Sequence, residues 1–319
     1  MRIVIALCER VLHRHGGQGG PEQASLIRQA AAQLAQVAHA HDLVIVHAGT
    51  NRIAAPAPHG HNGHSGCNGH TKHEVHGDAF PVEADLNLAY RLELELRNLL
   101  PSDRPCATLL SMVEVDSHDP AFAHPDKPVG SVLLGERALA VARANHWRIA
   151  QDGIGYRRVV PNPRPLRLLQ AEPLHRLVEQ GTVVVCAVGG VPVAADGGGL
   201  RGVEALIDCY SGAALVAEAI EADLFVIVTE MAGVFLDWGT ANSKLLRHGH
   251  PSALRELAST VGSMAPTLQA ASSFVERTGR RAAIGALNDV ARLVDGSAGT
   301  TISCERADPR RFEGGAVAY

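Results

Sequence analysis

Apolar runs of strand length alternate with segments of helical periodicity along most of the chain. The runs at 2–7 and 43–47 flank a segment, 22–41, whose Ala, Leu, Ile and Val recur at helical spacing. Three further apolar runs lie at 182–187, 224–229 and 282–286. Runs that are apolar at every position are typical of strands buried on both faces, as in a parallel sheet. The order strand, helix, strand predicts an α/β fold built from βαβ units.

Further elements follow from the same patterns. Helices are expected at 86–100, about 134–145, 166–180, 212–222, 252–261, 266–277 and 287–294, and strands at 107–115 and 300–303. The segment 116–165 is polar and rich in proline, which predicts a small lobe inserted into the main fold. Residues 1–115 and 166–319 are then the two parts of one α/β core.

Composition narrows the classes of protein. Of 319 residues 46% are hydrophobic and only 4% aromatic, so aliphatic side chains must fill a sizeable core. The net charge of −4 argues against nucleic acid as a partner. No apolar run reaches the roughly 20 residues of a membrane span, and the N-terminal run lacks the features of a signal peptide. Six scattered cysteines are no disulfide framework. These features together predict a cytoplasmic protein without a membrane partner.

Functional groups cluster where the predicted strands end. Glycines at the carboxyl end of a buried strand let a ligand approach the backbone, and open α/β sheets bind ligands at that edge. The alternative is that these residues only form turns between strands. The groups predicted at this edge are Cys8, Arg10, His47, Asn51, Arg52, Gly189, Gly190 and Cys209.

A histidine-rich segment occupies residues 56–77. Its candidate metal ligands are His59, His61, His64, Cys67, His70, His73 and His76. Imidazole and thiolate suit zinc, nickel or copper, and the glycines between them would let the chain wrap around an ion. The pattern matches no defined zinc finger, so two interpretations stay open. One is a metal-binding or storage module, and the other is a solvated loop with incidental metal affinity.

Long strings in the chain resemble the carbamate kinases, members of the amino-acid kinase fold. The similarity extends over about residues 1 to 301. The strings that carry it are RIVIAL from Arg2, ELRNLLP from Glu95, VEVDSHDPAFAHPDKPVG from Val113, GYRRVVPNPRP from Gly155, GVEALID from Gly202, DWGT from Asp237, GSMAP from Gly262 and FVERTGRRAAIGAL from Phe274.

The resemblance implies a three-layer α/β/α sandwich with a mainly parallel central sheet. It also implies a protruding subdomain at 116–165, a homodimer, and phosphoryl transfer between ATP–Mg and carbamate. Lys127 matches the lysine that, in this family, reaches from the subdomain toward the transferred phosphoryl group. Tyr156 and Arg157 lie in a retained string, either as substrate-binding groups or as structural residues that pair with local carboxylates.

The chain departs from the family where the phosphates bind. The family's Gly-Gly-Asn after the first strand is Cys8-Glu9-Arg10, and the lysine expected after Ile-Asp is Cys209. A second expected lysine is Thr267. Phosphoryl transfer relies on backbone donors and cations around the migrating group. The substitutions therefore predict absent or weak ATP:carbamate phosphotransferase activity.

Two other interpretations remain. In the first, the scaffold is a repurposed enzyme in which Lys127, Cys8, Cys209 and His47 are catalytic. Arg10 or Arg52 would favour the thiolate form of a nearby cysteine, as a nucleophile or metal ligand, and would suit a small carboxylate or carbamoyl substrate. The alternative for both cysteines is that they are small apolar fillers. In the second, the chain is a regulatory homologue that binds a partner through the retained dimer surface.

Overall fold

The computed structural model describes residues 1–12, 21–48, 80–189, 191–240, 242–258, 264–305 and 312–313. Within them an eight-stranded sheet has the order β15-β17-β16-β12-β1-β2-β9-β3. Its strands are β1 (Arg2–Leu7), β2 (Asp42–His47), β3 (Cys106–Leu110), β9 (Val183–Ala187), β12 (Leu224–Thr229), β15 (His248–Gly249), β16 (Arg281–Ala286) and β17 (Thr300–Ile302). All pairings are parallel except β16 with β17. The expected α/β class with a mainly parallel sheet is confirmed.

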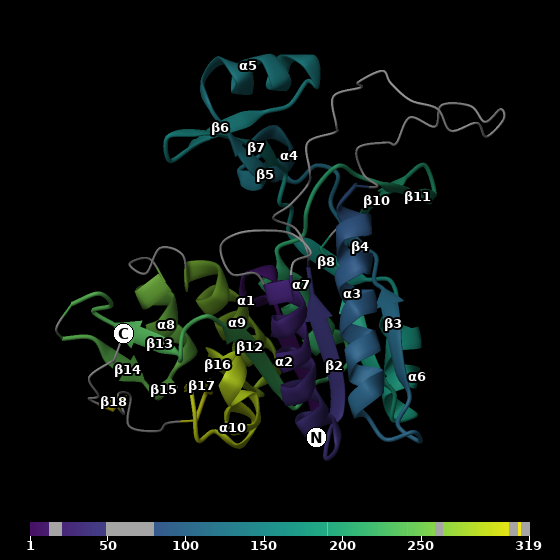
Figure 1. The fold of residues 1–319 in the computed structure, drawn as a ribbon, viewed down its shortest axis with the longest axis vertical. Helices are drawn as coiled ribbons and strands as arrows, with labels where there is room; N and C mark the ends of the chain where they lie inside the picture. The colour runs from purple at the N-terminus through teal and green to yellow at the C-terminus, as the bar shows by residue number, and fades with distance from the viewer. Residues whose placement is uncertain are drawn as a thin grey trace.

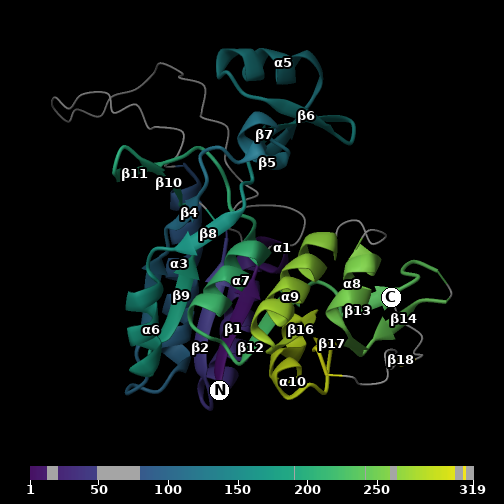
Figure 2. The ribbon, with the colours of Figure 1, turned by 180° about the vertical axis from the view of Figure 1, so that it is seen from behind.

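Helices cover both faces of this sheet (Figures 1 and 2). On one face pack α2 (Pro21–Ala38), α3 (Phe80–Leu99) and α10 (Val290–Asp295). On the other pack α6 (Ala171–Glu179), α7 (Cys209–Ala219) and α9 (Ala265–Thr278). Strand β1 alternates between the two layers, with Ile3 and Ile5 on the α2 side and Val4 on the α7 side. Burial on both faces explains why the central strands are apolar at every position.

A smaller lobe stands apart from the main body in Figure 1. It consists of the sheet β5-β7-β6, formed by β5 (Lys127–Leu133), β6 (Ile149–Asp152) and β7 (Gly155–Val160), with α4 (Pro120–Ala123) and α5 (Gly135–Ala144). A second sheet, β11-β10-β4-β8, lies between the lobe and the body. Its strands are β4 (Val113–Val115), β8 (Pro165–Leu168), β10 (Pro192–Asp196) and β11 (Gly199–Gly202). The lobe lies inside 116–165, and the domain boundaries drawn there stay a prediction.

Six shorter elements complete the described structure. They are α1 (Glu9–Leu12), β13 (Val234–Leu236), β14 (Lys244–Leu246), α8 (Pro251–Ala258), η2 (Leu287–Asp289) and β18 (Phe312–Glu313). Strands β13, β14 and β18 form a small antiparallel sheet. Among the helices of the described residues, none combines the length and the apolar composition needed to cross a membrane.

Two predicted elements are wrong in detail. The helix expected at 166–180 is strand β8 followed by the shorter α6, because Leu168 pairs with Val113 across the second sheet. The single strand expected at 107–115 is β3 and β4, which belong to different sheets. The chain turns between them at Ser111, whose backbone N–H donates to Ala187. Apolar periodicity does not distinguish one long element from two short ones in succession. The strand pairing in the folded protein determines where each element ends.

Helix α7 approaches the sheet closely at Gly212. A Cβ there would lie 2.9 Å from Cγ2 of Val188 and 3.3 Å from Cγ2 of Ile207. We expect Gly212→Ala to lower the free energy of unfolding by about 1–3 kcal/mol, because overpacking outweighs the gain of about 1 kcal/mol in helix propensity. Urea denaturation measures this, with Gly199→Ala as a control, because Gly199 is exposed and a Cβ there would have no contact closer than 3.7 Å, so stability should change by less than about 0.5 kcal/mol. A more stable Gly212→Ala protein would contradict the close packing.

Candidate functional site

The carboxyl ends of β1, β2 and β9 meet at one edge of the central sheet, where the N-terminus of α7 also lies. The strands are neighbours in parallel register, with Ala6 opposite Val46 and Val46 opposite Cys186. Cys8 directly follows β1, and Gly189 follows β9. The backbone carbonyl of Gly189 accepts a hydrogen bond from the N–H of Ile207, two residues before α7 begins. These strand ends converge as the sequence predicts.

Cys8 and Cys209 are joined by a disulfide across this edge. Their Cα atoms are 6.1 Å apart although 201 positions separate them in the chain. The bond links the end of β1 to the first residue of α7, and it packs with Ala48 and Tyr210. Both cysteines are buried. A disulfide holds no thiolate, so the predicted roles of Cys8 and Cys209 as nucleophile or metal ligand can apply only to the reduced pair.

Asp208 is the point where the lobe meets α7. Its carboxylate caps the helix by accepting from the N–H groups of Tyr210 and Ser211, each at 3.1 Å. Nζ of Lys127 donates to the other oxygen at 2.9 Å. Lys127 begins β5, so its side chain extends from the lobe to the residue before Cys209. Lys127 thus reaches, through Asp208, the helix terminus at which the Cys8–Cys209 bond lies, and a catalytic role for these three residues stays a prediction.

His47 lies on the other face of the sheet. Side chains alternate along β2, so His47 shares the α2 side with Ile45, whereas Ala48 packs against the cysteine pair. Burial lowers the pKa of His47 to about 4, so the ring is neutral at neutral pH. Neither ring nitrogen has a hydrogen-bond partner among the residues that the structure describes. A catalytic role for His47 beside the cysteines would need its ring to be on the other face.

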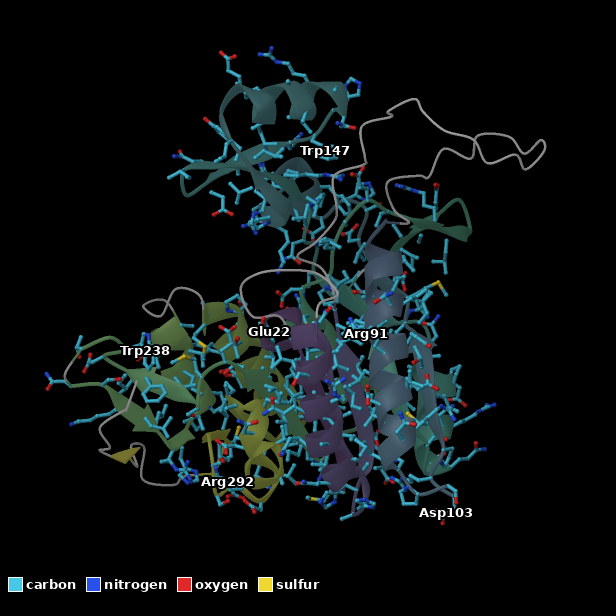
Figure 3. The ribbon with its side chains drawn as sticks, in the orientation of Figure 1. Glu22, Arg91, Asp103, Trp147, Trp238 and Arg292 are labelled. Carbon is cyan, nitrogen blue, oxygen red and sulfur yellow. A yellow bond between two sulfur atoms is a disulfide. The ribbon has the colours of Figure 1, made fainter. Side chains whose placement is uncertain are left out.

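The two arginines of the retained Tyr-Arg-Arg string contact the lobe itself and the segment that precedes α7. Nε of Arg157 pairs with Oδ2 of Asp152 at 2.8 Å, across the β6–β7 hairpin. Arg158 stacks over Trp147, 4.7 Å from the ring centroid, and pairs with Glu204. Figure 3 shows Trp147 within the lobe. These contacts favour the structural interpretation of the string, while substrate binding by Tyr156 and Arg157 stays a prediction.

Several predicted site residues lie outside what the structure describes. They are Asn51, Arg52, Gly190 and the candidate metal ligands His59, His61, His64, Cys67, His70, His73 and His76, and the side chain of Arg10 is likewise not described. Across the described part of the chain, no group of three or more His, Cys, Asp or Glu side chains is placed to hold a metal ion. Metal binding by the histidine-rich segment therefore stays a prediction.

Sequence reasoning missed two residues of this site. One is Asp208, and the other is Asn162, whose Oδ1 accepts the backbone N–H of Asp208 at 3.0 Å. An aspartate directly before a helical segment is a helix N-cap signal and could have identified Asp208. Its ion pair with Lys127 spans 81 positions, so no local pattern could have predicted it.

Comparisons with known proteins agree with the fold. The model of the amino acid kinase family matches residues 1–286. The chain is 41% identical to the carbamate kinase of Haemophilus influenzae over 307 residues, which covers 95% of this chain and 97% of that protein. It is 38% identical to the carbamate kinase of Rhizobium meliloti over 314 residues, covering 97% and 95%.

Solved structures show the same architecture. A protein from Aeropyrum pernix aligns with a TM-score of 0.83 at 28% identity, covering 95% of this chain and 99% of that one. The carbamate kinase of Giardia lamblia bound to AMP-PNP aligns with a TM-score of 0.80 at 23% identity, covering 94% and 98%. At that identity the Giardia structure supports the fold alone.

The disulfide should contribute to stability because it closes a loop of about two hundred residues in the unfolded chain. We expect Cys8→Ser to lower the free energy of unfolding by about 2–5 kcal/mol relative to the oxidised protein. Urea denaturation with and without dithiothreitol measures this, and the reductant should bring the wild type close to the variant. Cys304→Ser, at an exposed free cysteine, is the control. An unfolding midpoint of the wild type that dithiothreitol does not move would contradict the expectation.

His47 should make stability depend on pH between about 4 and 6.5. In this window the unfolded histidine binds a proton and the folded one does not, because burial lowers its folded pKa to about 4. The free energy of unfolding should therefore fall as pH falls, by up to about 3 kcal/mol from this residue, with no effect above pH 6.5. Denaturation across this range should show a smaller slope for His47→Gln than for the wild type. The exposed His124→Gln is the control, and equal slopes for His47→Gln and wild type would refute the assignment.

Proposed function

The chain belongs to the carbamate kinases of the amino acid kinase family, and from this premise we propose that it is a divergent member with absent or weak ATP:carbamate phosphotransferase activity. The observation that carries the proposal is the Cys8–Cys209 disulfide. It occupies the two positions at which the family resemblance implies a glycine and a lysine for the phosphates. A disulfide is uncharged, so it cannot replace the lysine, and the Cys8 side chain occupies space that a glycine would leave open for a ligand to approach the backbone.

The distribution of positive charge at this edge also supports absent or weak phosphotransferase activity. Phosphoryl transfer is accelerated by cations placed around the migrating group. The lysine expected at Cys209 is absent, and the one expected at Thr267 is a buried threonine of α9. Lys127 is retained, but its charge is paired with Asp208 at 2.9 Å. An incoming phosphate would therefore compete with a carboxylate for the one family lysine that remains among these three positions.

A second candidate function is a non-kinase enzyme acting on a small carbamoyl- or carboxylate-type molecule. It is favoured by the placement of two cysteines and Lys127 around Asp208 at the edge where α/β sheets bind ligands. Once reduced, the pair would offer sulfur nucleophiles or ligands for a soft metal beside a lysine. ATP–Mg would be a substrate only if kinase activity is retained.

We also propose that the protein is a homodimer. The family resemblance implies this state, and the outer surface of α3 offers an apolar contact. Leu86, Tyr90 and Leu94 recur every four residues along α3 and are exposed, Tyr90 by 64%. Positions four apart lie on one face of a helix, so these side chains form a stripe that a second copy could cover.

The ATP:carbamate phosphotransferase activity can be tested directly. We expect the purified protein to turn over ATP and carbamate at least tenfold more slowly than the Haemophilus influenzae enzyme, measured side by side by coupling ADP release. The test is run with and without dithiothreitol, so that the oxidation state of Cys8 and Cys209 is controlled. A rate within tenfold of the Haemophilus enzyme in either state would overturn the proposal.

A lysine restored at position 209 makes the test sharper. Cys209→Lys and Cys209→Ser both remove the disulfide, and they differ in the positive charge. If a missing phosphate cation limits the reaction, the lysine variant should be at least tenfold faster than the serine variant, since a tenfold change in rate corresponds to about 1.4 kcal/mol of transition-state stabilisation. Equal rates for the two variants would show that loss of this cation is not the cause.

A further inference from the structure

Cys8 and Cys209 differ from the other cysteines that the structure describes. Cys106 and Cys186 are buried within strands of the sheet, and Cys304 is exposed near the end of the chain. We propose that Cys8 and Cys209 form a reversible dithiol–disulfide couple, in which Cys209 is the sulfur that exchanges with low-molecular-weight disulfides such as glutathione disulfide. This inference does not depend on the proposed function, because it concerns the chemistry of the pair itself.

Two rigid elements hold the sulfurs together. Strand β1 is hydrogen-bonded on both sides, to β2 and β12, and α7 packs against the same sheet. The Cα separation of 6.1 Å lies in the middle of the range that a disulfide accepts. Because β1 and α7 are each held by packing and strand pairing that do not involve the bond, the thiols should stay adjacent after reduction. Two thiols held in this way can form the disulfide again without a large conformational change.

Helix geometry selects Cys209 as the exchanging sulfur. It is the first residue of α7, an eleven-residue helix whose dipole favours a thiolate at this end. The neighbouring Asp208 carboxylate would oppose this, but it is paired with Lys127 and already accepts two helix N–H groups. Cys8 has no comparable support, since the helix that follows it, α1, has only four residues.

The remaining buried cysteines serve as internal controls. Burial raises the pKa of Cys106 to about 11 and that of Cys186 to about 12. At neutral pH both are thiols, and a thiol reacts slowly with a disulfide because the thiolate is the attacking form. Among the buried cysteines, reaction confined to Cys8 and Cys209 would therefore reflect their position in the fold.

The oxidation balances in two steps. The Cys209 thiolate attacks one sulfur of glutathione disulfide, forming a Cys209–glutathione mixed disulfide and releasing one glutathione thiolate. Cys8 then loses its proton and attacks the Cys209 sulfur, which forms the Cys8–Cys209 bond and releases the second glutathione thiolate. The protein gives up two electrons and two protons, and the glutathione disulfide is reduced to two glutathione molecules. Excess glutathione reverses both steps.

The couple lies beside the groups that would bind a ligand. Cys209 follows Asp208 directly, and Asp208 carries the ion pair to Lys127 of the lobe. Formation of the bond ties the end of β1 to the helix terminus that Asp208 caps. The bond therefore constrains the helix terminus at which Asp208 pairs with Lys127 of the lobe.

A redox titration of the full-length protein tests the couple. The protein is equilibrated in buffers of varied glutathione to glutathione disulfide ratio, quenched in acid, alkylated and analysed by peptide mass spectrometry, which keeps the six cysteines apart. We expect Cys8 and Cys209 to become protected together, with one midpoint reached from both the oxidised and the reduced side. Protection that cannot be reversed by glutathione, or a pair that stays reduced at every ratio, would overturn the proposal.

The order of attack is tested with two single variants. In Cys8→Ser, Cys209 should accumulate the mixed disulfide with glutathione, and in Cys209→Ser the reaction of Cys8 should be at least tenfold slower. Both variants lack the disulfide, so loss of that bond affects them equally. In urea, where α7 is unfolded, the two rates should become similar. A Cys8 that reacts as fast as Cys209 in the folded proteins would refute the assignment of Cys209.

Discussion

Burial of the central strands on both faces is the constraint on which the rest of the structure depends. Strands β1, β2, β9 and β12 lie in parallel between two helical layers, so almost every side chain in them must be apolar. Polar chemistry is then confined to the strand ends, where the chain leaves the layers. Alternation along each strand also decides which layer an end residue faces. For this reason Cys8 lies with α7, whereas His47, one strand away, is enclosed on the side of α2.

Asp208 connects the lobe to this framework. A carboxylate that caps a helix, accepts two N–H groups and pairs with a lysine is held in one orientation by all three contacts. The segment that precedes α7 makes two further contacts with the lobe. Asn162 accepts a hydrogen bond from the backbone N–H of Asp208, and Glu204 pairs with Arg158. The position of Lys127 is therefore tied to the N-terminus of α7. Any ligand that takes Lys127 from Asp208 must replace that pairing.

Among the residues that the structure describes at this edge, two positions lack the lysine that the family resemblance implies. A neutral disulfide and a buried threonine stand at positions where the resemblance implies glycine and lysines, while the overall fold matches known carbamate kinases across nearly the whole chain. Scaffold and site have thus diverged to different degrees. Packing of aliphatic layers tolerates many sequences of similar volume, whereas stabilisation of a phosphoryl group depends on a few charges at fixed places.

The sequence by itself indicated the family, through long strings that resemble the carbamate kinases, and it located most of the elements. Burial on both faces leaves continuous apolar runs, which locate β1, β2, β9, β12 and β16 to within about a residue. It also located the edge at which Cys8 and Cys209 lie, since parallel strands end together. Only the tertiary structure decided which groups are partners, because the disulfide joins residues 201 positions apart and the ion pair of Lys127 with Asp208 spans 81. The boundary between β8 and α6 and the layer that encloses His47 likewise depend on strand pairing and on the helices that cover each face. Such contacts depend on how the sheet, its helices and the lobe pack together in space. They cannot be predicted from the spacing of side chains along the chain.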